Sequence, residues 1–300
     1  MEFVKAITLF IDNKRLIEVK DSSISTYSYT FNSIFLPYLP NETMDLDENH
    51  VLCIYEYLLK NLSRKTVVDK LNLLNDFLKF LFSKNYIDNI YSIPVPKKKK
   101  VKINIFNSNE QKILIDYLIK NMTHCNFSIL LALKTGLRIG ELSALQVKDI
   151  KSNCIKVTKT LQRIKNFNTK INKKTIIKID TPKSESSIRN IPIVDPHLIL
   201  LFNNLYKGLP SNSYLLSGSA NFLEPRAIER RFENILKTCN INHKNFHILR
   251  HTFATNCIKN KMEIKALSSI LGHSSVYTTY DLYIHLDYDT LVFEMEKMTI

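Results

Sequence analysis

A chain of 300 residues is long enough for one large domain or two of ordinary size, and its 45% of apolar residues can form a sizeable core. The formal net charge of +14 indicates a polyanionic partner, either a nucleic acid or an acidic membrane surface, unless it reflects a general bias toward Lys. Only 5 residues are Gly, and none lies in a G-x-G-x-x-G or Walker pattern, which argues against nucleotide-binding proteins of those classes.

The five cysteines are scattered along the chain and form no C-x-x-C pair. This pattern predicts neither a zinc site nor a disulfide framework, and it fits free thiols in a reducing compartment. The N-terminus carries Glu2 and Lys5 and does not resemble a signal peptide, and no segment reaches the roughly 20 apolar residues of a membrane span. We therefore expect a cytoplasmic protein with no membrane partner and no metal site.

Apolar side chains follow helical spacing through the first eighty residues. The first three expected helices cover residues 3–11, 24–35 (with Ser22 and Ser23 as candidate caps) and 51–59. The fourth is the clearest, with Ser63 placed to cap it and one apolar stripe made by Val67, Leu71, Leu74, Leu78 and Leu81. A helical first domain is therefore predicted.

The polar face of this fourth helix is basic and includes Arg64, Lys65 and Lys70. A basic face on a capped helix can lie along a phosphate backbone. An ordinary solvated face is the alternative for each of these residues. We treat Arg64, Lys65 and Lys70 as candidate DNA-binding residues.

A proline- and lysine-rich segment follows the first domain. Pro94 and Pro96 precede a run of four lysines, Lys97, Lys98, Lys99 and Lys100. Proline keeps such a segment extended, and adjacent like charges repel one another. The segment is expected to be a linker, either a strap whose lysines cross a DNA backbone or a solvated tether.

The second domain is expected to begin with a helix from Ser108, which forms a capping-box pattern with Gln111. The next helix, 127–134, is apolar on nearly all sides and is therefore expected in the core. Two glycines then flank Arg138 in the segment 135–145, where they permit a tight turn. Glu141, three residues later, is placed to brace Arg138 by a charge-assisted hydrogen bond, although a surface ion pair is the alternative.

Alternating apolar residues predict three strands, at 154–158, 175–179 and 188–193. We expect them to form one small antiparallel sheet. The loop 181–187 would join the last two strands and carry Lys183 at its tip. Lys183 in that position would reach a ligand or remain an inert loop lysine. Helices are expected again at 197–206 and 224–238.

Two clusters near the C-terminus, residues 246–252 and 271–283, contain His, Arg and Tyr. His247 and Arg250 are three residues apart and project from the same face of a helix. Phosphate is the obvious substrate group for such a segment, because Arg binds it bidentately and His moves protons near neutral pH. A final helix from residue 288 is apolar on one side and would pack on its own body or on a neighbouring protomer.

Four motifs occur in the order and spacing of the tyrosine recombinase (phage integrase) family. They are the segment 135–145, the stretch T-P-K-S-x-x-S-x-R-x-I-P-I with Lys183, the pair His247 and Arg250, and the segment 271–283. The chain resembles this family from residue 135 to 285, and its helical first domain resembles the family's core-binding domain.

The resemblance implies a mainly α fold with a small antiparallel β-sheet. It implies a helical core-binding (SAM-like) DNA-binding domain at 1–91, a basic linker at 92–107, and an α+β catalytic domain at 108–300 with a C-terminal docking helix at 288–300.

The resemblance also assigns catalytic roles, one residue at a time. Arg138 and Arg250 match the family's two arginines, Lys183 the β-hairpin lysine, His247 and His273 the two histidines, Tyr283 the nucleophile and Glu141 the acidic support residue. Tyr277 and Tyr280 compete with Tyr283. Tyr283 is favoured because it follows a Thr-Thr pair and precedes Ile284 and His285, and Tyr280 remains the main alternative.

In the implied reaction Tyr283 attacks a DNA phosphodiester, forms a 3′-phosphotyrosine and releases a 5′-hydroxyl. The two arginines would stabilise the charge that develops on the phosphate oxygens. His247 would accept the phenolic proton and Lys183 would protonate the departing oxygen. No cofactor is needed for this chemistry.

The expected partner is a double-stranded DNA target site, bound by a homotetramer that assembles on DNA from a chain that is monomeric in solution. An accessory directionality factor is a further candidate partner. The start of the chain near its core-binding domain favours a simpler recombinase for chromosome-dimer resolution or inversion. The spacing before Tyr283 instead favours integration or excision of a mobile element. A DNA-binding factor with a decayed site and a type IB-like topoisomerase are the alternatives.

Overall fold

The computed structural model describes residues 1–91, 93–96, 104–151, 153–165, 175–181 and 185–277. The chain divides into two compact units, residues 1–102 with 164–176, and residues 103–163 with 177–300. The division between 102 and 103 falls inside the segment expected to be a linker.

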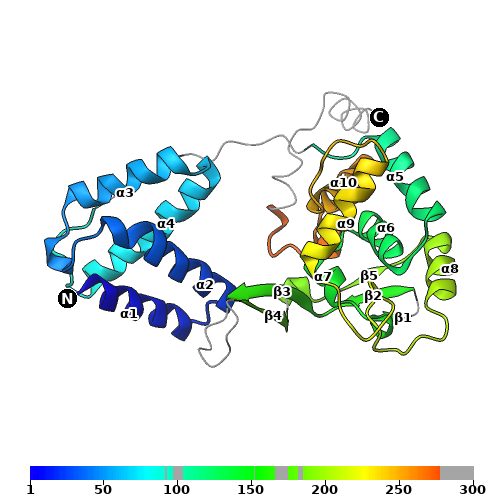
Figure 1. Ribbon diagram of the computed structural model, residues 1–300, viewed down its shortest axis with the longest axis horizontal. Coiled ribbons are helices and arrows are strands. Elements are labelled where there is room, and N and C mark those ends of the chain that lie inside the picture. Colours follow the sequence, from blue (N-terminus) through cyan, green and yellow to red (C-terminus); the bar gives the residue numbers. More distant parts are fainter. Residues whose placement is uncertain (92, 97–103, 152, 166–174, 182–184, 278–300) are drawn as a thin grey trace, which may run out of the picture. The chain divides into compact units, whose positions relative to one another are not determined.

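The first unit is helical (Figure 1). Its α-helices are α1 (Phe3–Leu16), α2 (Asp21–Thr30), α3 (Glu48–Asn61) and α4 (Arg64–Ser83). Ser63 caps α4, because its hydroxyl accepts a hydrogen bond from the backbone N–H of Thr66 at 3.4 Å, as predicted. The predicted caps Ser22 and Ser23 are wrong, because α2 begins earlier, at Asp21, and both serines lie inside it.

Phenylalanine side chains build the core of the first unit. The ring of Phe77 on α4 lies edge-on to Phe10 of α1, with centroids 5.2 Å apart, and to Phe31, with centroids 4.8 Å apart. Phe10 and Phe31 also meet edge-on at 5.6 Å. Such pairs stabilise a core beyond the area that they bury, so this cluster locks α1 and α4 to the turn after α2.

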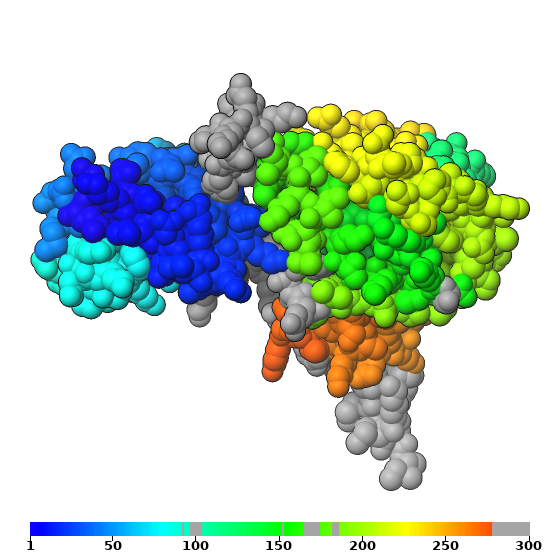
Figure 2. Space-filling model, turned by 90° about the horizontal axis from the view of Figure 1, so that it is seen from below, coloured from blue at the N-terminus to red at the C-terminus, as the bar shows by residue number. Residues whose placement is uncertain are grey.

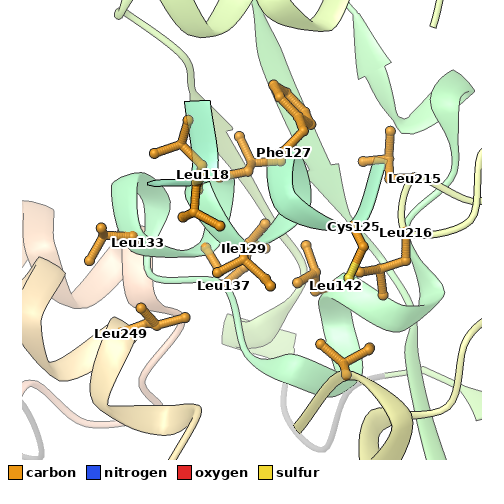
Figure 3. Packing of buried hydrophobic residues seen from close by; sticks show 14 of the residues in the cluster. Leu118, Cys125, Phe127, Ile129, Leu133, Leu137, Leu142, Leu215, Leu216 and Leu249 are labelled. Atoms are coloured by element: carbon orange, nitrogen blue, oxygen red, sulfur yellow. The ribbon is translucent and has the colours of Figure 1, made fainter. Parts of the chain in front are cut away.

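The second unit is built around α6. Its α-helices are α5 (Ser108–Lys120), α6 (His124–Thr135), α7 (Ile139–Ala144), α8 (Pro196–Leu205), α9 (Pro225–Thr238), α10 (His247–Lys259) and α11 (Ile264–Leu271). Residues 125–133 of α6 are all buried, as its uniformly apolar pattern predicts, and the helix packs against α5, α8 and α10. Figure 3 shows Phe127, Ile129 and Leu133 within this core.

The N-terminus of α5 is capped one residue earlier than expected. The side chain of Asn107 accepts from the backbone N–H of Glu110, and Glu110 Oε2 accepts from the backbone N–H of Asn107, both at 2.9 Å. The predicted box of Ser108 and Gln111 is therefore wrong. Gln111 instead donates to the carbonyl of Phe106 at 3.0 Å, which fixes the chain just before the helix.

The strands are β1 (Ile150–Lys151), β2 (Cys154–Val157), β3 (Thr160–Lys165), β4 (Thr175–Asp180) and β5 (Arg189–Pro192). β1, β2 and β5 form an antiparallel sheet in that order, while β3 and β4 form a separate two-stranded sheet. The expectation of one sheet from all three predicted strands is therefore wrong, because 175–179 pairs with a strand that was not predicted. The mainly α class with small antiparallel sheets is confirmed.

Short helical turns complete the described backbone. They are a π-helical turn at Phe31–Phe35 and 3₁₀ turns at Leu36–Tyr38, Thr43–Asp45, Val147–Asp149 and Glu185–Ser187. Within the described residues, every helix is too short or too polar to cross a membrane.

Candidate active site

Arg250 lies in the first turn of α10 and is only 3% exposed. Its Nη1 donates to the carbonyl of Gly136 at 2.8 Å, and its Nη2 donates to the carbonyl of Leu271 at 2.7 Å. These carbonyls stand at the C-terminal ends of α6 and α11, where intrahelical partners run out and the helix dipole is negative. The buried guanidinium is therefore compensated and held in one orientation.

A glycine in the left-handed backbone conformation follows the last residue of each of these helices. Gly136 has φ +69° and Gly272 has φ +64°, a region that glycine enters without steric cost. A Cβ atom on Gly272 would lie 3.0 Å from Arg189 Cδ, and one on Gly136 would lie 2.7 Å from Phe253 Cδ1. Both glycines therefore serve the turn and the close packing around the arginines.

Arg138 precedes α7 and is braced by Glu141, as predicted. The Arg138 Nη1 donates to Glu141 Oε1 at 2.7 Å, and its backbone N–H donates to Oε2 at 2.9 Å. Arg138 Nη2 also donates to the carbonyl of Gly272 at 3.1 Å. The Arg138 side chain stays 34% exposed while that of Glu141 is 2% exposed, so the cation faces outward from a buried anchor.

Arg189 on β5 completes this network and was not predicted as a site residue. Its Nη1 and Nη2 donate to the two oxygens of Glu141, each at 2.9 Å, and its Nε donates to the carbonyl of Ile270 at 2.5 Å. A signal for it existed in the sequence. Arg189 shares its strand face with Ile191 and Ile193, so a charge at that position had to be buried and paired.

The histidines lie beside these cations. The rings of His247 and His251 meet edge-on, with centroids 4.7 Å apart. Partial burial, His251, Arg250 and Arg138 together lower the pKa of His247 to about 4, although much of the residue is open to solvent. Burial, followed by Arg250 and Arg138, lowers the pKa of His273 to about 4. Both imidazoles are therefore neutral near pH 7, able to donate at one nitrogen and accept at the other.

The structure thus brings five of the predicted site residues together. They are Arg138, Glu141, His247, Arg250 and His273, drawn from α7, α10 and the turn after α11. Figure 2 shows the α11 segment, in orange, at the surface of the second unit. With Arg189 included, the cluster has three guanidiniums and one carboxylate, and it carries a positive charge suited to an oxyanion such as a phosphodiester.

Other predicted residues lie outside the described part of the chain. These are Lys183, Tyr280 and Tyr283, the linker lysines Lys97, Lys98, Lys99 and Lys100, and the helix 288–300.

The candidate DNA-binding face of α4 is divided between exposed and half-buried residues. Arg64 and Lys65 are exposed, as expected for a surface that meets a polyanion. Lys70 is half-buried, its ammonium donates to the hydroxyl of Thr30, and burial lowers its pKa. It therefore differs in environment from Arg64 and Lys65.

Comparison with known proteins agrees with this geometry. The model of the phage integrase family matches residues 104–290. Tyrosine recombinase XerD of Rickettsia bellii is 28% identical over 247 residues, which cover 77% of this chain and 76% of XerD.

Two solved structures are similar in fold. One is the Tn1549 transposon integrase in complex with transposon right end DNA, with a TM-score of 0.80 and 21% identity over the full length of both chains. The other is lambda integrase as a tetramer bound to a Holliday junction, with a TM-score of 0.65 and 13% identity over 92% of this chain and 78% of that one.

The family model covers more than half of the chain, including the segments that carry both arginines and both histidines. The resemblance predicted from four short motifs is confirmed, and with it the class of enzyme. The chain belongs to the phage integrase family of tyrosine recombinases, which cut and rejoin DNA.

Proposed function

We propose that this protein is a site-specific recombinase of double-stranded DNA that works through a 3′-phosphotyrosyl intermediate. The observation that carries the proposal is the arginine cluster, in which Arg138 and Arg250 are held by carbonyls of Gly136, Leu271 and Gly272. Fixed cations stabilise the charge that develops on phosphate oxygens without reorganising during the reaction, which is the largest electrostatic contribution available to phosphoryl transfer.

In the proposed cleavage step the phenolic oxygen of Tyr283 attacks the phosphorus and forms the new P–O bond. The bond from phosphorus to the 5′ oxygen breaks, and that oxygen receives a proton from Lys183. The proton of the phenol passes to His247, whose lowered pKa leaves it neutral and able to accept. His273 donates a hydrogen bond to a phosphate oxygen. Rejoining reverses these steps with a 5′-hydroxyl from the partner strand.

Sequence motifs support the roles of the two residues that the structure does not describe. Lys183 lies in the T-P-K-S stretch that leads to Arg189, and Arg189 contacts the anchor of Arg138. Tyr283 follows Thr278 and Thr279 and precedes Ile-His. Tyr280 is the competing nucleophile.

We propose residues 1–91 as the core-binding domain, 92–107 as a linker and 108–300 as the catalytic domain. Arg64 and Lys65 would meet the DNA backbone because they are exposed and basic, and the linker lysines would add phosphate contacts. Lys70 would contribute less, because it already donates to Thr30 and is half-buried.

We further propose that four protomers assemble on two duplexes and that the helix at 288–300 docks on a neighbouring protomer. The similarity in fold to lambda integrase, whose tetramer is bound to a Holliday junction, supports this assembly. The proposed biological role is integration or excision of a mobile element, or resolution of chromosome dimers or inversion. The similarity in fold to the Tn1549 transposon integrase supports a role in a mobile element, to which an accessory directionality factor would belong.

A covalent selection tests the proposal. The protein is incubated with a pool of randomised duplexes, each nicked so that the released fragment diffuses away and cleavage cannot be reversed. Protein–DNA adducts that survive denaturation are recovered and sequenced. We expect one duplex sequence to be enriched, and Tyr283→Phe to abolish trapping while retaining DNA binding.

Three other results of these assays would each contradict part of the proposal. If trapping persists in Tyr283→Phe but is lost in Tyr280→Phe, the nucleophile is Tyr280 and not Tyr283. No trapping by the wild type, with DNA still bound, would favour a binding protein with a decayed site. Relaxation of supercoiled DNA by a single protomer would favour a topoisomerase.

A further inference from the structure

Three successive carbonyls at the end of α11 each accept a hydrogen bond from a different arginine. Arg189 Nε donates to the carbonyl of Ile270 at 2.5 Å, Arg250 Nη2 to that of Leu271 at 2.7 Å, and Arg138 Nη2 to that of Gly272 at 3.1 Å. The arginines come from β5, α10 and the start of α7. The end of α11 therefore sets the relative positions of three cations that are distant in sequence.

Arg189 differs from the other two arginines because most of its N–H groups donate to acceptors within the protein. Its side chain is 5% exposed, and it donates to both oxygens of Glu141 and to the carbonyls of Ser187 and Ile270. A guanidinium has five N–H groups, so most of those on Arg189 are engaged inside the protein. The geometry does not suit direct contact with DNA.

The carboxylate of Glu141 is shared between two guanidiniums. Arg138 and Arg189 each make two hydrogen bonds to it, and together they lower its pKa against the opposing effect of burial. If Arg189 were absent, the whole negative charge of the buried carboxylate would fall on Arg138. Arg138 would then attract a phosphate less strongly, because its positive charge would be paired with the carboxylate and an ion pair in a partly buried site is strong.

The backbone around Gly272 is fitted to Arg189. A Cβ atom on Gly272 would lie 3.0 Å from Arg189 Cδ and 3.1 Å from its Nη1. The close approach of the side chain and the turn indicates that Arg189 also fixes the segment leading into His273.

We propose that Arg189 is a positioning residue of the recombination reaction, which compensates Glu141 and fixes the end of α11 so that Arg138 keeps its charge and direction for the scissile phosphate. This proposal rests on the proposed function, because it assumes that a phosphodiester binds at Arg138.

The test uses the full-length protein and the nicked duplex recovered by the covalent selection. Single-turnover trapping is measured for wild type, Arg189→Met, Arg189→Lys and the double variant Arg189→Met with Glu141→Gln. Lys244→Met is the matched control. It removes another buried cation, 3.1 Å from Glu110 Oε1, at a site outside the arginine cluster. Thermal melting tests whether each variant is folded at the assay temperature.

We expect Arg189→Met to slow trapping by about 100-fold, the cost typical of a small misplacement near a reacting centre. Its affinity for the duplex should change much less, because most phosphate contacts remain. Adding Glu141→Gln should restore part of the lost rate, because it removes the uncompensated carboxylate. Arg189→Lys, which keeps the charge with fewer donors, should fall between wild type and Arg189→Met.

A measurement without DNA adds a second readout. Arg189 is one of the cations that lower the pKa of His273, after burial, Arg250 and Arg138. Titration of labelled histidine by NMR should show the pKa of His273 rising in Arg189→Met and staying low in Lys244→Met. An unchanged pKa in Arg189→Met would contradict the placement of the Arg189 charge beside His273.

The proposal is overturned if Arg189→Met traps DNA as fast as Lys244→Met, or if Glu141→Gln deepens its defect instead of relieving it. If Arg189→Met does not fold, Arg189→Lys decides, and a wild-type trapping rate in that variant overturns the proposal. Failure of the wild type to trap any duplex would instead reject the proposed function.

Discussion

The backbone N–H of Phe106 donates to the hydroxyl of Thr252 at 3.2 Å, across 146 residues of sequence. Thr252 is fully buried on α10, two residues after Arg250, and Phe106 lies just before α5. The C-terminal end of the expected linker is therefore tied directly to the helix that carries His247 and Arg250.

Replacing Thr252 by Val keeps the shape of the side chain but removes the acceptor for Phe106. We expect a loss of about 1–3 kcal/mol in the free energy of unfolding, because a buried N–H is left without a partner. Urea denaturation measures it. Thr255→Val on the same helix is the control, since the Thr255 hydroxyl donates locally to the carbonyl of His251 at 2.9 Å and its removal should cost little. Equal stability of the two variants would contradict the prediction.

Gly136→Ala tests the turn that presents its carbonyl to Arg250. A left-handed φ of +69° costs a non-glycine residue about 1–2 kcal/mol. Contact with Phe253 Cδ1 at 2.7 Å and Leu271 Cδ2 at 2.8 Å adds about 1–3 kcal/mol of overpacking.

Gly208→Ala separates the two contributions to that cost. Gly208 has a φ of +76° but open space around its Cβ direction, so its replacement should show the backbone cost alone. Melting temperatures compare the two variants, and a Gly208→Ala variant as destabilised as Gly136→Ala would argue against the packing contribution.

Stability should fall with acid because of the two site histidines. The pKa of both His247 and His273 is lowered from 6.5 to about 4 in the folded protein, so the unfolded chain binds more protons between these values. Their contribution is fully present above pH 6.5 and is lost as the pH falls toward 4. Urea midpoints measured across this window should decline, and His273→Asn should make the decline shallower. An unchanged slope in that variant would remove His273 from the explanation.

Lys244, in the segment that leads into α10, forms a second largely buried ion pair with Glu110 of α5, at 3.1 Å. Lys244→Met should cost about 3 kcal/mol, the low end of the range for breaking a buried pair, since Glu110 keeps some contact with water. Combining it with Glu110→Gln should cost less than the sum of the two single changes. Chemical denaturation of the three variants measures this coupling, and additivity would show that the two charges act independently.

Helices were predictable from the sequence where one signal dominated. The stripe ending at Leu81 and the serine at position 63 define α4, and the uniformly apolar segment after position 124 defines the buried α6. The spacing of Arg138 and Glu141 was sufficient to predict their hydrogen bond, because an acidic side chain at the third position of a helix reaches back to the residue that precedes the helix.

Features that depend on tertiary packing were not predictable in the same way. Leu161 and Ile164, the buried residues of β3, are three apart, so this strand lacks the alternation that predicts a strand, and its pairing with β4 was missed. At α5, Asn107 and Ser108 compete as caps, and only the fold selects Asn107. For Arg189 the alternation with Ile191 indicates burial, but its partners Glu141 and Ile270 follow only from the pairing of β2 with β5 and the approach of α11.

Among the residues that the structure describes, the two units have hydrophobic cores with no residue in common, one containing Phe77 and the other α6. Because the chain has no tryptophan, a single introduced indole gives a fluorescence signal from one core alone. Phe80→Trp, beside Phe10 in the first unit, and Phe202→Trp, beside Tyr206 in the second, place such reporters at partly buried rings packed against the two cores. Melting curves from this pair of proteins would reveal whether the halves of the enzyme unfold together or in succession.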